Sequence, residues 1–130
     1  MSWEMHDKEF ESAFRLPVKQ RYDYFIKKVA DWEKVWSLAT KDGWVLACDD
    51  EGKEAVPVWP HERFAEACVS QWPGSESRSI ELSIWKDRWL PGMLADGRLV
   101  AVFPTPGGKG VLVSPDQLTC DLNKEISLME

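Results

Sequence analysis

The sequence has no long hydrophobic run and no regular cysteine spacing. Its purely apolar stretches span only a few of the 130 residues, whereas a membrane-spanning helix needs about 20. The first residues also lack the basic and apolar stretches of an export signal. Cys48, Cys68 and Cys120 are odd in number and far apart, unlike the cysteines of a zinc site or a disulfide framework. We therefore expect a cytoplasmic protein with no membrane contact, bound metal or cofactor.

Positive charge is also scarce. The chain has 16 Lys and Arg against 22 Asp and Glu, a formal net charge of −6. Nucleic-acid affinity comes largely from Lys and Arg that displace counterions, so we expect no nucleic-acid partner. No internal repeat or low-complexity tract is present, and 44% of the residues are hydrophobic. We therefore expect residues 1–130 to form a single folded domain.

Helices are indicated where apolar residues recur every three or four positions. The clearest pattern covers residues 18–32, where Lys and Asp fill the opposite side. A second strong signal is Ser114 followed by Pro115, Asp116 and Gln117, which is typical of a helix start. Shorter helices are predicted over residues 3–14, over residues 60–72 with Pro60 in the first turn, and from Ser83 onward with a break or kink at Pro91.

Strands are indicated by short apolar segments between turn residues. Residues 35–40, 44–48 and 54–59, separated by Asp-Gly and Glu-Gly turns, predict an antiparallel meander with an edge or bulge at Pro57. Residues 99–103 and 111–113 are apolar throughout, which predicts strands covered on both faces. Residues 75–79 are polar and predict a loop. The order α-β-β-β-α-α-β-β-α indicates an α+β domain with helices on a mostly antiparallel sheet of about five strands.

Two short motifs resemble ligand sites but lack the required context. The segment Gly107-Gly108-Lys109-Gly110 is rich in glycine, but a strand follows it instead of the helix that a phosphate-binding loop needs. We interpret it as a hairpin turn with a solvated lysine. The acidic segment Asp49-Asp50-Glu51 does not have the alternating spacing of a calcium loop. We interpret it as an acidic hairpin tip.

The eight tryptophans are the most unusual feature. This is more than one small core readily hides, so we expect one or two to be exposed, with Trp59, Trp85 and Trp89 as the candidates. Together with His61 they form the predicted patch for another protein or a small apolar or aromatic ligand. The leading hypothesis is a non-enzymatic binding module in which Trp59, His61 and Trp89 line a shallow apolar site.

Two alternatives remain open. The first is a small enzyme that uses His61 with a carboxylate. Glu62 is poorly placed for this role, because adjacent residues on a helix do not face one another. The second is an acidic immunity or regulatory protein that binds a basic partner through Asp49-Asp50-Glu51 and the C-terminal acids. The sequence assigns no catalytic residue and predicts no oligomeric state.

Several short sequence segments, in their order and spacing, resemble those of an uncharacterised bacterial family known as domain of unknown function 2750. The resemblance covers most of residues 18–123 and implies a small, stand-alone, cytoplasmic bacterial domain. It carries over no functional residue, and it leaves residues 1–16 as a peripheral N-terminal segment. The segments that show the resemblance are Arg21-Tyr22 through Ala30, Trp36-Ser37-Leu38 with Asp42-Gly43-Trp44, Val58-Trp59-Pro60-His61 with Ala65, Trp89-Leu90-Pro91-Gly92, Val102-Phe103-Pro104-Thr105-Pro106, and Gly110 through Pro115.

Overall fold

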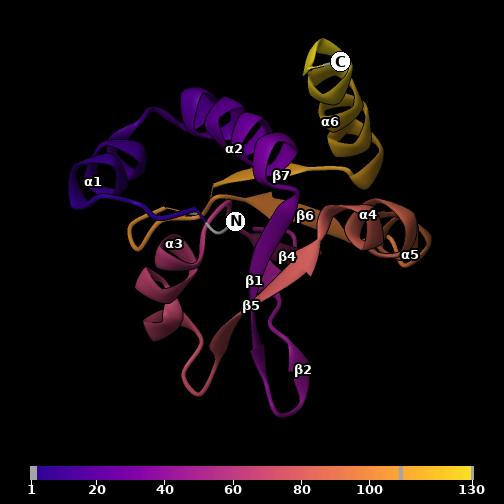
Figure 1. The fold of residues 1–130 in the computed structure, drawn as a ribbon. Helices are drawn as coiled ribbons and strands as arrows, with labels where there is room; N and C mark the ends of the chain where they lie inside the picture. The colour runs from indigo at the N-terminus through magenta and orange to yellow at the C-terminus, as the bar shows by residue number, and fades with distance from the viewer. Residues whose placement is uncertain (1–2, 109, 130) are drawn as a thin grey trace.

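The computed structural model describes residues 3–108 and 110–129. The helices are α1 (Asp7–Arg15), α2 (Val18–Trp32), α3 (Glu62–Ala67), α4 (Leu82–Ile84), α5 (Leu90–Ala95) and α6 (Pro115–Met129), with a 3₁₀ turn η1 (Val69–Gln71) and a π-helical turn η2 (Trp85–Trp89). The strands are β1 (Lys34–Thr40), β2 (Gly43–Trp44), β3 (Ala47–Cys48), β4 (Glu54–Val58), β5 (Glu76–Glu81), β6 (Leu99–Val102) and β7 (Val111–Val113). The α+β class is therefore confirmed (Figure 1).

The strands form two sheets rather than one. One sheet has the order β2-β1-β5, and the other has the order β3-β4-β6-β7. Neighbouring strands are antiparallel except for β4 and β6, which are parallel. An antiparallel bridge between Trp36 and Trp59 joins the sheets, with N–H···O distances of 2.9 and 2.8 Å. The predicted meander is thus divided between the sheets, because β2 pairs with β1 whereas β3 pairs with β4.

Strand β5 corrects the prediction of a loop at residues 75–79. All six residues of β5 pair with β1, from Lys34 opposite Glu81 to Ala39 opposite Glu76. Ile80 is the buried residue of this strand, and the other side chains are polar. A polar strand is stable here because it lies at a sheet edge, where one face and one side remain in water.

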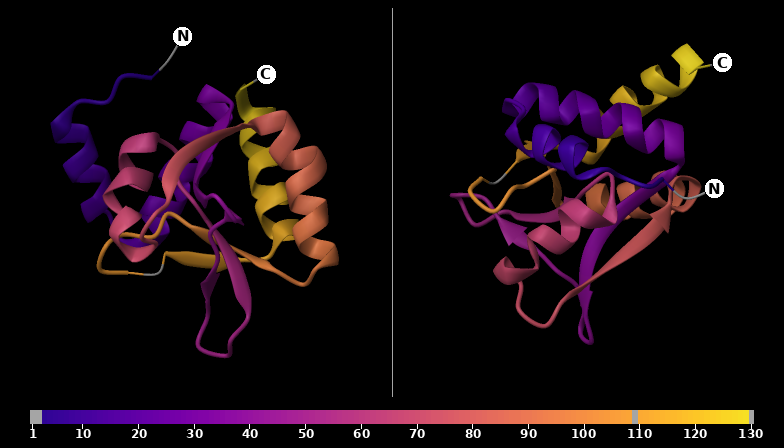
Figure 2. Two further views of the ribbon diagram at one scale, coloured as in Figure 1. Left: turned by 90° about the horizontal axis from the view of Figure 1, so that it is seen from below. Right: turned by 60° about the vertical axis from the view of Figure 1, so that its left-hand side comes forward.

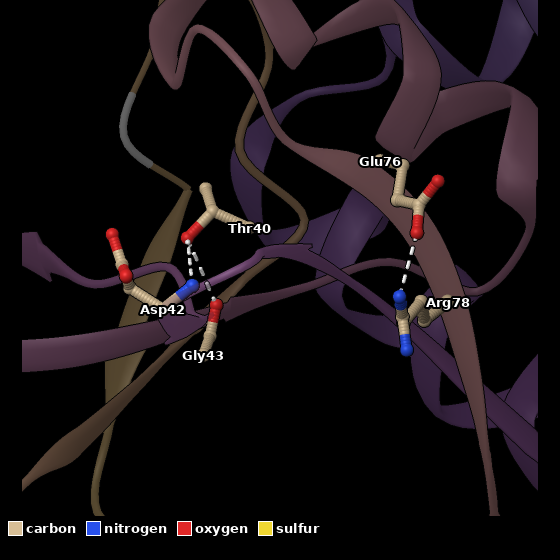
Figure 3. A network of polar contacts seen from close by, with 5 residues as sticks. All are labelled: Thr40, Asp42, Gly43, Glu76 and Arg78. Atoms are coloured by element: carbon tan, nitrogen blue, oxygen red, sulfur yellow. Dashed lines mark hydrogen bonds and ion pairs between the residues drawn. The ribbon is translucent and has the colours of Figure 1, made fainter.

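The predicted Asp-Gly turn between residues 40 and 44 is confirmed. Thr40 Oγ1 accepts a hydrogen bond from the Asp42 backbone N–H at 3.2 Å and donates one to the Gly43 carbonyl at 3.4 Å (Figure 3). Gly43 has φ +124°, which favours glycine because it has no Cβ. On β5, the carboxylate of Glu76 and the guanidinium of Arg78 form an exposed ion pair at 2.7 Å (Figure 3). The tip of this sheet is therefore polar and solvated.

Pro57 lies in an inner strand, not in the predicted edge strand, yet no ladder hydrogen bond is lost. Pairing of β3 with β4 ends at Ala55, and the next N–H on that side of β4 belongs to Trp59, which donates to Trp36. Because N–H groups alternate along a strand, the missing N–H of Pro57 falls in the gap between these two partners. The Pro57 carbonyl accepts a hydrogen bond from the buried Ser37 hydroxyl at 2.6 Å.

Helices α2 and α6 pack against the four-stranded sheet, whereas α3 packs against β1 and β5 of the other sheet. Helix α2, with the predicted bounds, contacts β7 and α6, and α6 contacts β6 and α5 (Figure 2). Ser114 caps α6 as predicted, since its Oγ accepts from the Gln117 N–H at 3.2 Å. The helical ladder is interrupted at η2, one turn before the predicted break at Pro91, where the Leu90 N–H donates to the Trp85 carbonyl. Among the described residues, no helix is both long and apolar enough to span a bilayer.

Large aromatic side chains fill the space between the sheets and the helices. Trp59, Trp85, Phe25, Phe64 and Phe103 are fully buried there. They belong to one hydrophobic cluster that also contains the valines of β4 and β6. Strand β6 is covered on both faces as predicted, but β7 is not, because it forms a sheet edge and Leu112 is 37% exposed.

Candidate binding pocket

The predicted exposure of Trp59 and Trp85 is wrong, because both side chains are completely buried. The backbone of Trp59 is fixed by the bridge to Trp36, and its indole N–H donates to the Pro104 carbonyl at 2.8 Å. Trp85 belongs to the core cluster, and its indole N–H has no hydrogen-bond partner among the described residues. A large aromatic ring therefore served the core at two positions where the sequence predicted a surface role.

The four residues of the predicted patch lie in three separate aromatic groups. Trp59 packs edge-to-face against Trp72, with 6.2 Å between ring centroids. Trp89 is half-buried and packs against Trp85 at 5.4 Å and against Trp44 at 4.6 Å. The third group is formed by His61, Trp3 and Phe64. The contacts of these side chains give no shared aromatic surface for one ligand.

His61 is the N-cap of α3 and is buried, with an exposed fraction of 8%. Its Nδ1 accepts from the Arg63 backbone N–H at 3.1 Å, and its Nε2 lies 2.9 Å from the Trp3 carbonyl oxygen. These two contacts fit the neutral tautomer with hydrogen on Nε2. Both ring nitrogens are thus engaged by backbone groups, and no carboxylate is among these partners. Helix α3 starts at Glu62, two residues after the predicted first-turn Pro60.

The acidic segment 49–51 lies at the tip of the hairpin that joins β3 and β4, as predicted. Asp49 Oδ1 accepts from the backbone N–H groups of Glu51 at 2.9 Å and Lys53 at 2.7 Å. The carboxylate of Asp49 therefore stabilises the loop. The described residues contain no group of three or more His, Cys, Asp or Glu side chains arranged to hold a metal ion.

A pocket of about 340 Å³ lies on the face of the four-stranded sheet marked by Ala101 and Leu112, which pair in register. Small side chains of β3 and β6 form its floor, Trp72 forms one wall, and the loop after β6 forms the other. The lining residues are Ala47, Cys48, Gln71, Trp72, Ala101, Pro104, Pro106, Gly107, Gly108 and Leu112.

The walls of this pocket are held by hydrogen bonds to backbone carbonyls. Pro104 O accepts from the Trp59 indole and lies 3.6 Å from the Cys68 thiol, and Thr105 O accepts from the Gln71 amide at 3.2 Å. On the opposite wall, the Trp72 indole donates to the Leu46 carbonyl at 3.1 Å. The pocket is therefore largely formed without a ligand, as is usual for small-molecule sites.

Backbone geometry at the end of β6 also fixes the loop. Phe103 has φ +58°, an uncommon value for a residue with a side chain. Its N–H donates to the Val58 carbonyl at 2.8 Å, and its carbonyl accepts from Arg21 Nε at 3.1 Å. The buried Arg21 also donates to the Leu16 carbonyl at 2.9 Å, and burial lowers the pKa of its guanidinium. The left-handed backbone conformation of Phe103 thus turns the chain into the loop that lines the pocket.

Among the residues that the structure describes, which do not include Lys109, the pocket lining has no charged side chain. The polar groups along it are the Gln71 amide and backbone groups, and Cys48 of β3 also borders the pocket. The Cys68 thiol lies beside the Pro104 carbonyl, and burial raises its pKa to about 11. This thiol therefore stays protonated at neutral pH. Cys48, in contrast, is exposed. The chemistry that the pocket offers is apolar contact with a few neutral hydrogen-bonding groups.

Comparison with known families agrees with the resemblance in the sequence. The family model described as "Protein of unknown function (DUF2750)" matches residues 22–122. The chain belongs to the DUF2750 family. All residues that line the pocket lie within the matched DUF2750 region, whereas α1 lies outside it. No curated protein matches the chain.

Sequence reasoning missed Trp72, Gln71 and Leu112 as pocket residues. A weak signal was present, because the loop at 104–108 combines two prolines and two glycines after an apolar strand. The turn predicted at residues 107–110 agrees with the antiparallel pairing of β6 and β7 and the bridge between Thr105 and Gly108. Lys109, predicted to be solvated, lies outside the described residues.

Proposed function

We propose that this DUF2750 protein is a non-enzymatic binding module for a neutral small molecule that carries a flat ring. The observation that carries the proposal is the pocket of about 340 Å³ beside Trp72, in which none of the described lining residues is charged. This volume is near the lower end of the range for ligand pockets, about 300–1,000 Å³. A charged ligand would leave water without gaining a counter-charge from the described lining residues, so a neutral ligand is favoured.

The shape of the pocket favours a ring. Ala47 and Ala101 give a low floor, and the Trp72 indole offers a flat aromatic wall. Gln71 supplies a polar contact: its amide N–H already donates to Thr105, which leaves the carbonyl Oε1 to accept from a ligand hydroxyl. We therefore propose an aromatic alcohol or a similar neutral compound as the ligand class.

Three naphthalene compounds of similar size test this proposal. They are 2-naphthylmethanol, 2-naphthoate and 2-naphthylmethylammonium, which are neutral, negative and positive. We expect the neutral compound to bind at least about tenfold more tightly than either ion. Shifts of the eight tryptophan indole N–H resonances in NMR spectra measure binding, and the Trp72 signal should move most. Equal binding of all three compounds would contradict the proposed ligand class.

The cysteines provide a second measurement on the unmodified chain. Iodoacetamide should alkylate the exposed Cys48 and Cys120, and should leave the buried Cys68 unmodified. Bound 2-naphthylmethanol should slow alkylation of Cys48, which lines the pocket, and leave Cys120 on α6 unchanged as an internal control. Mass spectrometry of peptides measures each rate. Equal slowing at both cysteines would show that the ligand does not occupy this pocket.

A pair of glycine variants completes the test. A Cβ at Gly107 meets no atom of the described residues within 4 Å, so Gly107→Leu has room at its Cβ and adds side-chain volume at the pocket. We expect it to weaken binding of 2-naphthylmethanol at least about tenfold. Gly92 in α5 is equally open, and Gly92→Leu is the matched control away from the pocket. Unchanged affinity in Gly107→Leu, with the fold retained, would refute the proposed site.

A further inference from the structure

The N-terminal segment, residues 3–15, lies beside α2 and α3 and outside the matched DUF2750 region (Figure 2). Its contacts are made with residues inside that region. Two carbonyls of the segment, two residues apart, are bound by side chains of α3 and its cap. His61 Nε2–H donates to Trp3 O at 2.9 Å, and Arg63 Nη1 donates to Met5 O at 3.1 Å. Because these bonds reach backbone oxygens, they bind an extended chain whatever its side chains are.

The side chain of Trp3 occupies an aromatic and cationic site on α2. Its ring stacks on Trp32 with 5.9 Å between centroids and an interplanar angle of 11°. Lys28 Nζ lies 5.0 Å from the Trp3 ring centroid, and His61 packs edge-on at 4.8 Å. Contacts of a cation and of stacked rings with an indole favour tryptophan over an aliphatic residue.

Further along the segment, α1 places two phenylalanines on the surface formed by α2 and α3. Phe10 stacks on Phe64 at 5.3 Å, and Phe14 packs on Phe64 at 5.0 Å. The guanidinium of Arg63 lies over the Phe10 ring at 4.5 Å. Polar contacts add to this attachment, with the Tyr24 hydroxyl donating to Glu9 at 2.9 Å. The α2–α3 surface therefore binds an extended peptide followed by an amphipathic helix.

The chain's own segment does not fill this surface completely. A cavity of about 80 Å³ remains beside Trp3, between Trp32, Trp36, Pro60 and His61. Glu62 and Lys34 also border it, so charges of both signs lie at its edge. An unfilled cavity lowers the stability of the arrangement in which residues 3–15 occupy this surface. A peptide that reaches further into the cavity would form more contacts than Trp3 does.

From these contacts we propose that the α2–α3 surface is a receptor for a tryptophan-bearing peptide of a partner protein, and that residues 3–15 occupy it as an autoinhibitory segment. The receptor residues belong to the DUF2750 domain, whereas the occupant does not. The partner's peptide is extended at its tryptophan and offers free carbonyls at that residue and two residues later. It binds when it displaces Trp3. This site is separate from the pocket beside Trp72.

The test uses the full chain and a fluorescent peptide that copies residues 3–16. In the wild type, the attached segment competes at a millimolar effective concentration, so the peptide should bind weakly. Trp3→Ala weakens this competitor, and we expect the peptide to bind the variant at least about tenfold more tightly by fluorescence anisotropy. Trp44→Ala removes an exposed tryptophan on the three-stranded sheet and is the matched control, with wild-type binding expected.

A second variant separates binding from folding. In the Trp3→Ala chain, His61→Asn keeps a short side-chain acceptor for the Arg63 N–H but removes the contact with the peptide carbonyl. Peptide affinity should fall while the melting temperature stays close to that of the Trp3→Ala chain. Peptide binding that is equal in Trp3→Ala, Trp44→Ala and wild type would overturn the proposal. A concentration-dependent dimer that exchanges these segments would also overturn it, because the occupant would then be a second copy.

Discussion

Replacement of Trp59 by phenylalanine tests whether this residue belongs to the core or to a binding surface. The indole is fully buried, donates to Pro104 O at 2.8 Å and packs on Trp72. Loss of the hydrogen bond should lower the free energy of unfolding by about 1 kcal/mol. The smaller ring leaves about 40 Å³ empty, which at about 24 cal/mol per Å³ adds about 1 kcal/mol, and lost transfer free energy adds about 1 kcal/mol more. We therefore expect a loss of about 3 kcal/mol.

Urea unfolding followed by circular dichroism measures this loss. The slope of the free energy against urea should stay unchanged, so that the midpoint alone moves. Trp44→Phe is the control, because Trp44 is 36% exposed, and we expect a loss below about 1 kcal/mol there. If Trp59→Phe and Trp44→Phe lower the stability equally, the assignment of Trp59 to the core is refuted.

Two further predictions concern alkaline pH and the loop glycines. Burial, with a hydrogen bond to a carboxylate, raises the pKa of both Tyr22 and Tyr24 above the ordinary value. Their contribution to stability is thus complete below pH 10 and is lost as the pH rises through the higher folded values, by at most about 1.4 kcal/mol per pH unit for each tyrosine. Absorbance at 295 nm and urea unfolding at pH 9–12 measure this, and phenols that titrate at their ordinary pH would contradict it. Gly110→Ala should lower the stability by more than about 3 kcal/mol, because Gly110 has φ +74° and an added Cβ would lie 2.4 Å from the Val102 carbonyl oxygen, whereas Gly107→Ala meets no atom within 4 Å. Thermal melts compare the two variants, and equal melting temperatures would count against the described loop.

Features that depend on neighbouring residues were predictable from the sequence. Helix α2 has the predicted bounds because its apolar residues repeat at helical spacing. The N-cap at Ser114 and the turn at Gly43 follow from side-chain oxygens and backbone freedom within four residues. Each of these signals is local, so no knowledge of distant partners was needed.

Features that depend on distant partners were not predictable in the same way. Strand β5 is polar, and it becomes a strand because β1, about forty residues earlier, supplies hydrogen-bond partners along its whole length. Likewise, a count of tryptophans does not say which of them are buried. Trp59 and Trp85 are buried because they lie between sheets and helices whose arrangement the sequence pattern did not specify.

The candidate pocket shows why a site can escape sequence analysis even when its parts are visible. Ala47 and Ala101 are unremarkable alone, and they share a floor because β4 pairs with β3 on one side and with β6 on the other. The parallel pairing of β4 with β6 requires the whole connection from α3 to α5. The buried indole of Trp59, predicted to contact a ligand, instead holds Pro104 in the pocket wall. Its contribution to the pocket is therefore positional, and depends on a hydrogen bond between residues 45 positions apart.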